Sequence, residues 1–245
     1  MKTTMYAYLR GERRPVGEQF DDYFDPATTA VVSIDMHRSH LDEHDCPCPG
    51  PRGREAIPLT DAFHRAARAV GVPIIHVRTW LRRDGVDDAK AARASWRRIL
   101  SWSGEAGPLL DEHVIEGTRW TEFLTEVLPD DLIVHKKRFS SFTATDLDFL
   151  LRNLRRDTIV IDGIFIDACD LSTGFDAANL DYKVLVPRDV VRGSSEEMEA
   201  AAFAIFSSYV GLVVESDELI AEWQARTRTM PGGRAVPAIA GQRGG

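Results

Sequence analysis

The chain has 245 residues, of which 44% are hydrophobic, and a formal net charge of −8. This length suffices for one sizeable hydrophobic core and does not require a second domain. The acidic balance provides no broad positive field for phosphate backbones, so we expect no nucleic-acid partner. No apolar run approaches the ~20 residues of a membrane-spanning helix, and residues 1–6 lack the apolar core of a secretion signal. We therefore expect a cytoplasmic protein with no membrane partner.

The composition divides the chain into three parts. Residues 1–27 are polar and irregular, and we expect an N-terminal arm that lies over the domain or over a partner subunit. Residues 28–226 form the expected domain. From residue 227 to residue 245, Pro, Gly and Arg dominate, which predicts a disordered tail.

Within the domain, buried strands alternate with helices. The strands are expected at 28–34, 72–78, 131–135, 158–161, 183–187 and 211–214. The helices are expected at 55–70, 146–154, from about 167 onward, 195–207 and 216–223. This alternation predicts an α/β fold with a six-stranded parallel sheet. The exception is 80–116, a long, charged and weakly periodic insertion that we expect to shape a pocket or a subunit contact.

Cys169 is the best candidate nucleophile in the chain. The β-branched run 158–161 is interrupted at Asp162-Gly163, and helical spacing begins at about Asp167. Free N–H groups and the positive dipole end at the start of that helix would stabilise a thiolate. The alternative is that Cys169 is a small buried hydrophobic residue, because a nucleophilic cysteine also needs a base from elsewhere in the chain.

Candidate partners for the cysteine follow two other strands. Asp35 ends the strand 28–34, at the sheet edge where open parallel sheets bind ligands, although an acid there can also cap a helix or stabilise a loop. Lys136 and Lys137 follow the strand 131–135. An acid, a lysine and a cysteine can together perform acyl transfer, with the carboxylate accepting the thiol proton and the ammonium holding the carboxylate.

The other two cysteines do not form a convincing site. Cys46 and Cys48 flank a proline and resemble half of a zinc site, but no second cysteine pair accompanies them. An odd number of cysteines also argues against a disulfide framework. We expect a proline-stiffened surface loop.

Three segments of the sequence resemble the isochorismatase-like cysteine hydrolases over residues 28–218. They are 30–36 (AVVSIDM), 136–147 (KKRFSSFTATDL) and 163–177 (GIFIDACDLSTGFDA). The resemblance implies a three-layer α-β-α, Rossmann-like fold. It places the family's Asp–Lys–Cys triad on Asp35, Lys136 and Cys169, since the family's lysine lies six residues before a phenylalanine, here Phe142. Lys137 is then expected to be a solvated or interface charge.

The same resemblance implies a cis peptide bond between Ile164 and Phe165. The N–H groups of Phe165 and Cys169 would then form an oxyanion hole. This chain departs from the family at Phe165, which replaces a typically small residue, and at Ile166, which replaces a threonine. Relatives that act on nicotinamide bind a metal through an acid and histidines after the second strand. Because 78–84 lacks that pattern, we expect no catalytic metal and no cofactor.

Several side chains near these motifs are candidates for contact with substrate. They are His37, His40, Trp80, Phe142, Ile164, Phe165 and Ile166. Trp102 would add to a partly apolar pocket, and Arg78 or Arg138 could receive a carboxylate.

The expected function is that of a cysteine-dependent hydrolase. It would cleave a C–N bond of a small amide or N-carbamoyl (ureido) compound through a thioester and release ammonia or carbamate. One alternative within the same fold is hydrolysis of an isochorismate-type vinyl ether, which needs no cysteine. Another is a non-catalytic binding subunit that keeps the fold. The resemblance and the N-terminal arm favour a homodimer or homotetramer.

Overall fold

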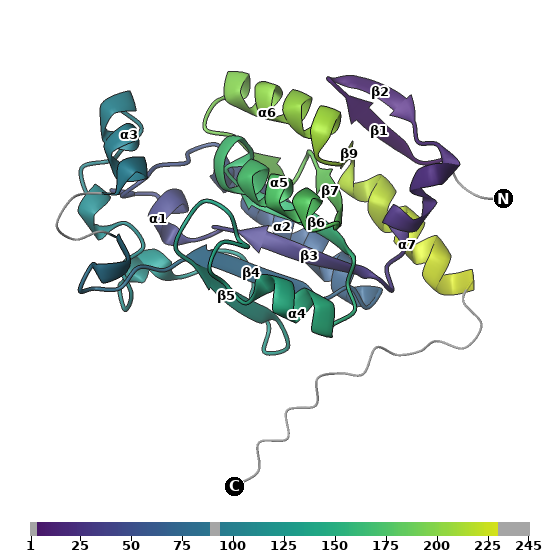
Figure 1. Ribbon diagram of the computed structural model, residues 1–245, viewed down its shortest axis with the longest axis horizontal. Coiled ribbons are helices and arrows are strands. Elements are labelled where there is room, and N and C mark those ends of the chain that lie inside the picture. The colour runs from purple at the N-terminus through teal and green to yellow at the C-terminus, as the bar shows by residue number, and fades with distance from the viewer. Residues whose placement is uncertain (1–3, 89–93, 230–245) are drawn as a thin grey trace, which may run out of the picture.

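The computed structural model describes residues 4–88 and 94–229 (Figure 1). All six short apolar runs that the sequence assigns to strands form strands in it, and helices separate them. In chain order the elements are β1 (Tyr6–Leu9), β2 (Glu12–Pro15), η1 (Glu18–Phe24), β3 (Thr29–Ile34), α1 (Arg38–Leu41), α2 (Gly53–Ala69), β4 (Ile74–Thr79), η2 (Val86–Asp88), α3 (Ser95–Ser103), η3 (Leu110–Glu112), η4 (Arg119–Thr121), β5 (Leu132–Lys136), α4 (Leu147–Asn153), β6 (Thr158–Ile164), η5 (Ile166–Asp170), α5 (Leu171–Asn179), β7 (Lys183–Pro187), β8 (Val191–Arg192), α6 (Glu196–Tyr209), β9 (Leu212–Val214) and α7 (Ser216–Thr229).

The strands form one sheet in the order β2-β1-β9-β7-β6-β3-β4-β5, with β8 paired to β6 off this path. The six predicted strands, from β9 to β5 in this order, pair in parallel. Strands β3 and β6 are buried along their entire length at the centre of the sheet. Their carboxyl ends, together with those of β4 and β5, therefore meet at one edge, where loops are free to build a site.

Helices cover both faces of the sheet, as Figure 1 shows. One face packs against α4, α5 and α6, for example through Leu151, Ala177 and Phe206. The other packs against α2 and α7 through Phe63 and Trp223. The predicted three-layer α-β-α fold is confirmed.

The sheet has nine strands rather than the predicted six, mainly because residues 6–15 form a hairpin. Arg10 and Gly11 both have positive φ, 52° and 84°, which suits a two-residue hairpin turn. Strand β1 also pairs antiparallel with β9, and Ala7 is buried against the core. The prediction of an irregular arm was therefore wrong for these residues. The charged side chains of 10–14 give no alternating apolar pattern, so the sequence did not indicate a hairpin there.

Strand β6 continues to Ile164, past the interruption that the sequence indicates at Asp162-Gly163. A Cβ at Gly163 would lie 2.1 Å from the Ile34 carbonyl oxygen, and its φ is +119°. Glycine is therefore required for β3 and β6 to approach closely just below their carboxyl ends.

The last helix, α7, also exceeds its predicted end and includes residues 227–229. The rest of the predicted disordered tail, 230–245, lies outside the described residues. Among the helices that the structure describes, none is both long and apolar enough to span a bilayer.

Candidate active site

Asp35 follows β3 directly and points into a network at the carboxyl edge of the sheet. Its φ of 53° lies in the left-handed region, which aspartate tolerates better than most residues. Its Oδ1 accepts hydrogen bonds from the backbone N–H of Thr79 at 2.8 Å and from the Thr79 hydroxyl at 3.1 Å. Its Oδ2 lies 2.7 Å from Nζ of Lys136. The acid is thus held between the ends of β4 and β5.

Lys136 joins the acid to the thiol. In the β4–β5 register it is the partner of Thr79, and its Nζ donates to the Thr79 hydroxyl at 2.8 Å. The same Nζ lies 3.3 Å from Sγ of Cys169. Lys137 points elsewhere, because its Nζ pairs with Asp87 at 3.1 Å. The alternation of strand side chains thus brings only Lys136 to the acid, as expected.

Cys169 lies in a single π-helical turn, η5, that connects β6 to α5. The N–H groups of Ala168 and Asp170 both donate to the Phe165 carbonyl, at 2.9 and 3.2 Å. The peptide bond between Ile164 and Phe165 is cis. Such wide turns recur at functional sites, and here the turn directs Sγ toward Lys136 rather than into the core.

The charges of the three groups follow from burial and from one another. Burial alone would raise the pKa of Asp35, but the Lys136 ammonium and His37 bring it well below its usual value. Burial also opposes the charge on Lys136, yet Asp35 and Cys169 raise its pKa. The resting pair is therefore a carboxylate and an ammonium.

The resting cysteine is a thiol, not the thiolate that its position near a helix start predicts. Burial raises the pKa of Cys169 well above its usual value, and the nearby Asp35 charge raises it further, against the effect of Lys136. The prediction was wrong because the dipole of one helix turn does not compensate for full desolvation of a negative sulfur. The site therefore combines a neutral thiol with an ionised carboxylate, and a carboxylate in such a pair can accept a proton.

These three side chains line one pocket, named here the triad pocket. The apolar part of its lining, named here the apolar wall, consists of Trp96, Leu100, Phe139, Phe165 and Ala168. The rest of the lining is polar or ionisable and comprises His40, Cys48, Thr79, His113, Lys137 and Arg138. A thiol, a carboxylate and an ammonium therefore share one cavity with apolar side chains that suit an apolar substituent.

Part of the lining of the triad pocket comes from the insertion at 80–116. Helix α3 supplies Trp96 and Leu100, and the loop after it supplies His113. Arg97 anchors the insertion, since its guanidinium donates to the carbonyl oxygens of Leu110 and His113. The sequence indicated that the insertion would shape a pocket, but its weak periodicity did not show which side chains face inward.

The residues predicted to contact substrate divide into two groups. His40 and Phe165 line the triad pocket, while His37 is buried behind it with Nε2 3.2 Å from Asp35 Oδ1. The remaining candidates are absent from its lining: Trp80 stacks on His135, Phe142 packs near Tyr182, and Ile164 and Ile166 are buried in hydrophobic clusters.

Of the two arginine candidates and Trp102, one residue lines the triad pocket and two do not. Arg138 lines the triad pocket. Arg78 instead donates to the Thr121 carbonyl at 2.7 Å and contacts His135. Trp102 is 85% exposed and is not among the lining residues. Trp102 lies on the exposed side of α3, so Trp96 and Leu100 form the wall instead.

Cys46 and Cys48 are buried, so the prediction of a surface loop was wrong. The N–H of Cys48 donates to the Ser39 carbonyl, and the N–H of Gly107 donates to the Pro47 carbonyl. These bonds hold the loop beneath the insertion. Burial raises the pKa of Cys48 to about 12, so its thiol stays protonated although it lines the pocket.

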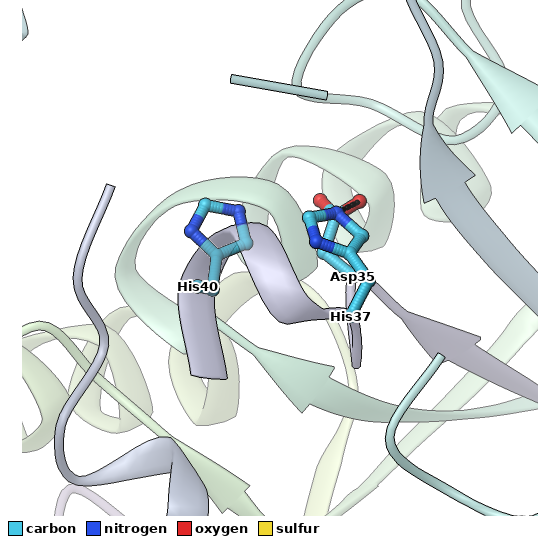
Figure 2. Close-up of side chains that lie close together, drawn as sticks. All are labelled: Asp35, His37 and His40. Atoms are coloured by element: carbon cyan, nitrogen blue, oxygen red, sulfur yellow. Dashed lines mark hydrogen bonds and ion pairs between the residues drawn. The ribbon is translucent and has the colours of Figure 1, made fainter. Parts of the chain in front are cut away.

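One cluster of possible metal ligands lies beside the triad. Asp35, His37 and His40 each offer a ligand atom within 4.8 Å of the others (Figure 2). However, the two imidazole rings stack with centroids 4.8 Å apart and planes 21° apart, so their in-plane lone pairs do not converge on one point. The Lys136 ammonium, 2.7 Å from Asp35 Oδ2, also neutralises the carboxylate and opposes a second cation there. The three groups as placed do not fit a metal site, and the absence of a catalytic metal stays a prediction.

Fold and site together define a class of three-layer α-β-α proteins with a buried acid, lysine and cysteine at one sheet edge. The Isochorismatase domain family model matches residues 29–218, and the chain belongs to this family of hydrolases. A cysteine hydrolase from Pseudomonas syringae pv. phaseolicola 1448A has the same fold, with a TM-score of 0.73 and 22% identity over 92% of this chain and 99% of that chain.

Two relatives whose names state an activity are similar to this chain in sequence. The ureidoacrylate amidohydrolase RutB of Methylobacterium radiotolerans is 26% identical over 77% of this chain and 77% of its own length. The N-carbamoylsarcosine amidase of Arthrobacter sp. is 24% identical over 66% of this chain. That match spans 58% of the amidase, so somewhat more than half of its length is compared. Both names describe hydrolysis of an N-carbamoyl or ureido group.

Proposed function

We propose that the protein is a cysteine amidohydrolase that cleaves a C–N bond of a small amide or N-carbamoyl compound. The observation that carries the proposal is the pair of contacts that Lys136 Nζ makes, 2.7 Å to Asp35 Oδ2 and 3.3 Å to Cys169 Sγ, in the wall of one pocket. The named activities of the two relatives support the substrate class.

In the first half-reaction, Sγ of Cys169 attacks the substrate carbonyl carbon while Asp35 takes the thiol proton. Lys136 stabilises negative charge that develops on sulfur, and it keeps Asp35 ionised beforehand. The backbone N–H groups of Phe165 and Cys169 receive the carbonyl oxygen as it becomes negative. The C–N bond then breaks, and Asp35 returns the proton to the departing nitrogen, leaving a thioester or a carbamoyl-thiol adduct on the enzyme.

In the second half-reaction, water attacks the carbonyl carbon of the adduct and gives one proton to Asp35. The C–S bond breaks, and Asp35 returns that proton to sulfur. One carboxylate therefore serves as base and acid in turn, which its ionised resting state allows.

The residues that line the triad pocket narrow the range of possible substrates. Trp96, Leu100 and Phe139 favour an apolar substituent next to the reactive carbonyl group. Arg138 lies at the same pocket and donates to backbone carbonyls, with no carboxylate partner in the described residues. We therefore propose an amide or N-carbamoyl compound that bears an apolar group and a carboxylate.

The test is a substrate panel. The N-carbamoyl derivatives of glycine, leucine and phenylalanine, which keep a carboxylate, are assayed for ammonia release and for the freed amine. The primary amides of the corresponding N-acetyl amino acids, which have no carboxylate, are assayed alongside them for ammonia release and for the freed acid. We expect turnover of at least one apolar member and none with Cys169→Ala. Turnover of an isochorismate-type vinyl ether that survives Cys169→Ala would support that alternative activity. Tight binding of the panel without turnover would indicate a binding subunit.

A further inference from the structure

His40 presents a free nitrogen lone pair to the triad pocket. Its Nδ1 lies 2.8 Å from the Cys48 carbonyl oxygen, which can only accept, so Nδ1 carries the hydrogen. In a neutral ring, Nε2 is then an acceptor. Burial supports this state, because it lowers the pKa of His40 to about 3. In the part of the chain that the structure describes, no group donates to this Nε2.

The ring of His40 also lies close to the Asp35 carboxylate. Figure 2 shows the ring of His40 turning a nitrogen toward Asp35 and His37, and a nitrogen of His40 lies within 4.8 Å of an Asp35 carboxylate oxygen. His40 also lines the pocket that contains Cys169. Two acceptors at this separation can be bridged by one small molecule that donates two hydrogen bonds of about 2.8 Å each, and water is such a molecule.

His37 cannot take this role. Its Nε2 lies 3.2 Å from Asp35 Oδ1, and its Nδ1 is buried without a partner in the described residues. It is absent from the lining of the triad pocket. His37 therefore orients the acid from behind, whereas His40 faces the cavity.

We propose that His40 binds and orients the water that hydrolyses the enzyme-bound adduct, an inference that rests on the proposed function. One hydrogen of the water is donated to Nε2 of His40, and the other proton passes to Asp35 as the oxygen attacks the adduct carbonyl carbon. The C–S bond breaks with its electron pair on sulfur, and Asp35 returns the proton to Cys169. His40 gains and loses no proton in this step.

Two variants separate the role of each ring nitrogen. His40→Asn keeps an N–H near the Nδ1 position, for the Cys48 carbonyl, and removes the acceptor at Nε2. His40→Gln places an amide oxygen near the Nε2 position and loses the bond to Cys48. If the role of His40 is purely structural, Asn should replace it better than Gln does. If His40 binds water, Gln should replace it better than Asn does.

The experiment follows the adduct on Cys169 by mass spectrometry during turnover of the best substrate of the panel. For His40→Asn we expect acylation within about threefold of the wild-type rate and hydrolysis of the adduct slower by about 10²-fold, as misplacement of a reacting group typically causes. The adduct then accumulates, and kcat and KM fall together while kcat/KM is unchanged. His40→Gln should recover hydrolysis to within about tenfold of wild type. Added hydroxylamine, a stronger nucleophile, should release the trapped adduct, as a hydroxamate from a thioester or as a hydroxyurea from a carbamoyl thiol.

The proposal is overturned if His40→Asn turns over like wild type, or if it slows acylation without trapping an adduct. It is also overturned if Gln is no better than Asn at restoring hydrolysis while circular dichroism shows both variants folded. These results differ from failure of the proposed function, in which the wild-type enzyme itself forms no adduct and Cys169→Ala retains turnover.

Discussion

Among the described residues, two buried clusters of an acid and a basic side chain can be compared, and one of them lines the triad pocket. At the carboxyl edge of the sheet, Asp35, Lys136 and Cys169 meet in the wall of the triad pocket. Between the sheet and helix α2, Asp162 Oδ2 lies 2.8 Å from Nε2 of His64, and neither side chain is exposed. Both clusters pair an acid with a basic side chain at hydrogen-bonding distance.

The cluster under α2 continues across neighbouring strands of the sheet. The rings of His64 and His76 are 5.4 Å apart, and His76 Nε2 lies 3.1 Å from Asp131, which also pairs with Arg68 at 2.6 Å. None of these residues lines the triad pocket. A buried acid–base pair is therefore not in itself a sign of catalysis. What distinguishes the first cluster is a thiol, that of Cys169, and a pocket that the thiol and the ion pair line together.

The largest effect is expected for Cys169→Ala. Removing the nucleophile should lower kcat/KM by about 10⁴-fold, since the other groups of a catalytic set give little acceleration without it. The thermal midpoint should change little, because Ala fills most of the buried volume. Cys46→Ala, at a buried cysteine outside the triad pocket, is the matched control and should keep activity. Equal losses in the two variants would contradict the assignment.

The next effect concerns the ion pair beside the thiol. Lys136→Met leaves Asp35 buried without its counter-charge, so unfolding free energy should fall by about 3–5 kcal/mol and kcat/KM by about 10²–10³-fold. The double variant Asp35→Asn/Lys136→Met removes both charges and should recover much of the stability but none of the activity. Chemical denaturation and ammonia release measure the two quantities. Recovery of activity in the double variant would exclude Asp35 as the base.

A substitution in the cluster under α2 should lower stability but leave activity nearly unchanged. His64→Leu leaves Asp162 fully buried without its hydrogen-bond partner, so we expect unfolding free energy to fall by about 2–3 kcal/mol. The kcat/KM of the folded fraction should stay within about threefold of wild type at 25 °C. A selective loss of kcat with unchanged stability would show that this cluster takes part in the reaction after all.

The smallest effect is expected in the pH profile. Asp35 must be ionised, its pKa is held well below its usual value, and activity should therefore be present above that pKa and lost only as pH falls through it. An ordinary histidine titrates near pH 6.5, but His40 has a pKa of about 3. We expect kcat/KM to stay flat from about pH 8 down to about pH 5. An acid limb near pH 6.5 would show that a histidine with an ordinary pKa controls the reaction.

The sequence predicted the strand ends that carry the site, because buried β-branched runs and the period of two are local properties. Asp35 follows one such run, and the alternation at the end of β5 directs Lys136 to Asp35 and Lys137 to Asp87. The direction of single side chains in irregular segments was not predictable. Phe165 faces the pocket and Ile166 faces the core although they are neighbours, and only the π-helical turn determines this difference.

The insertion was the least predictable part of the site. Trp96 and His113 are 17 positions apart, yet their rings lie 5.7 Å from each other, and His113 is fixed by a 2.6 Å contact between its Nδ1 and Ser39 Oγ. Such contacts join distant segments and leave no periodic signal in the sequence. The ionisation state of Cys169 was missed for a related reason, since burial depends on the complete tertiary structure.

The N-terminal hairpin has a consequence for self-association. Strand β2 is the outermost strand on its side of the sheet, and all four of its residues, Glu12 to Pro15, are exposed. Charged side chains and a proline at an open edge discourage the addition of another strand from a second molecule, and they protect against aggregation. If copies of this chain assemble, they should therefore meet through helical surfaces or through the opposite edge at β5, where Ile133 is 44% exposed.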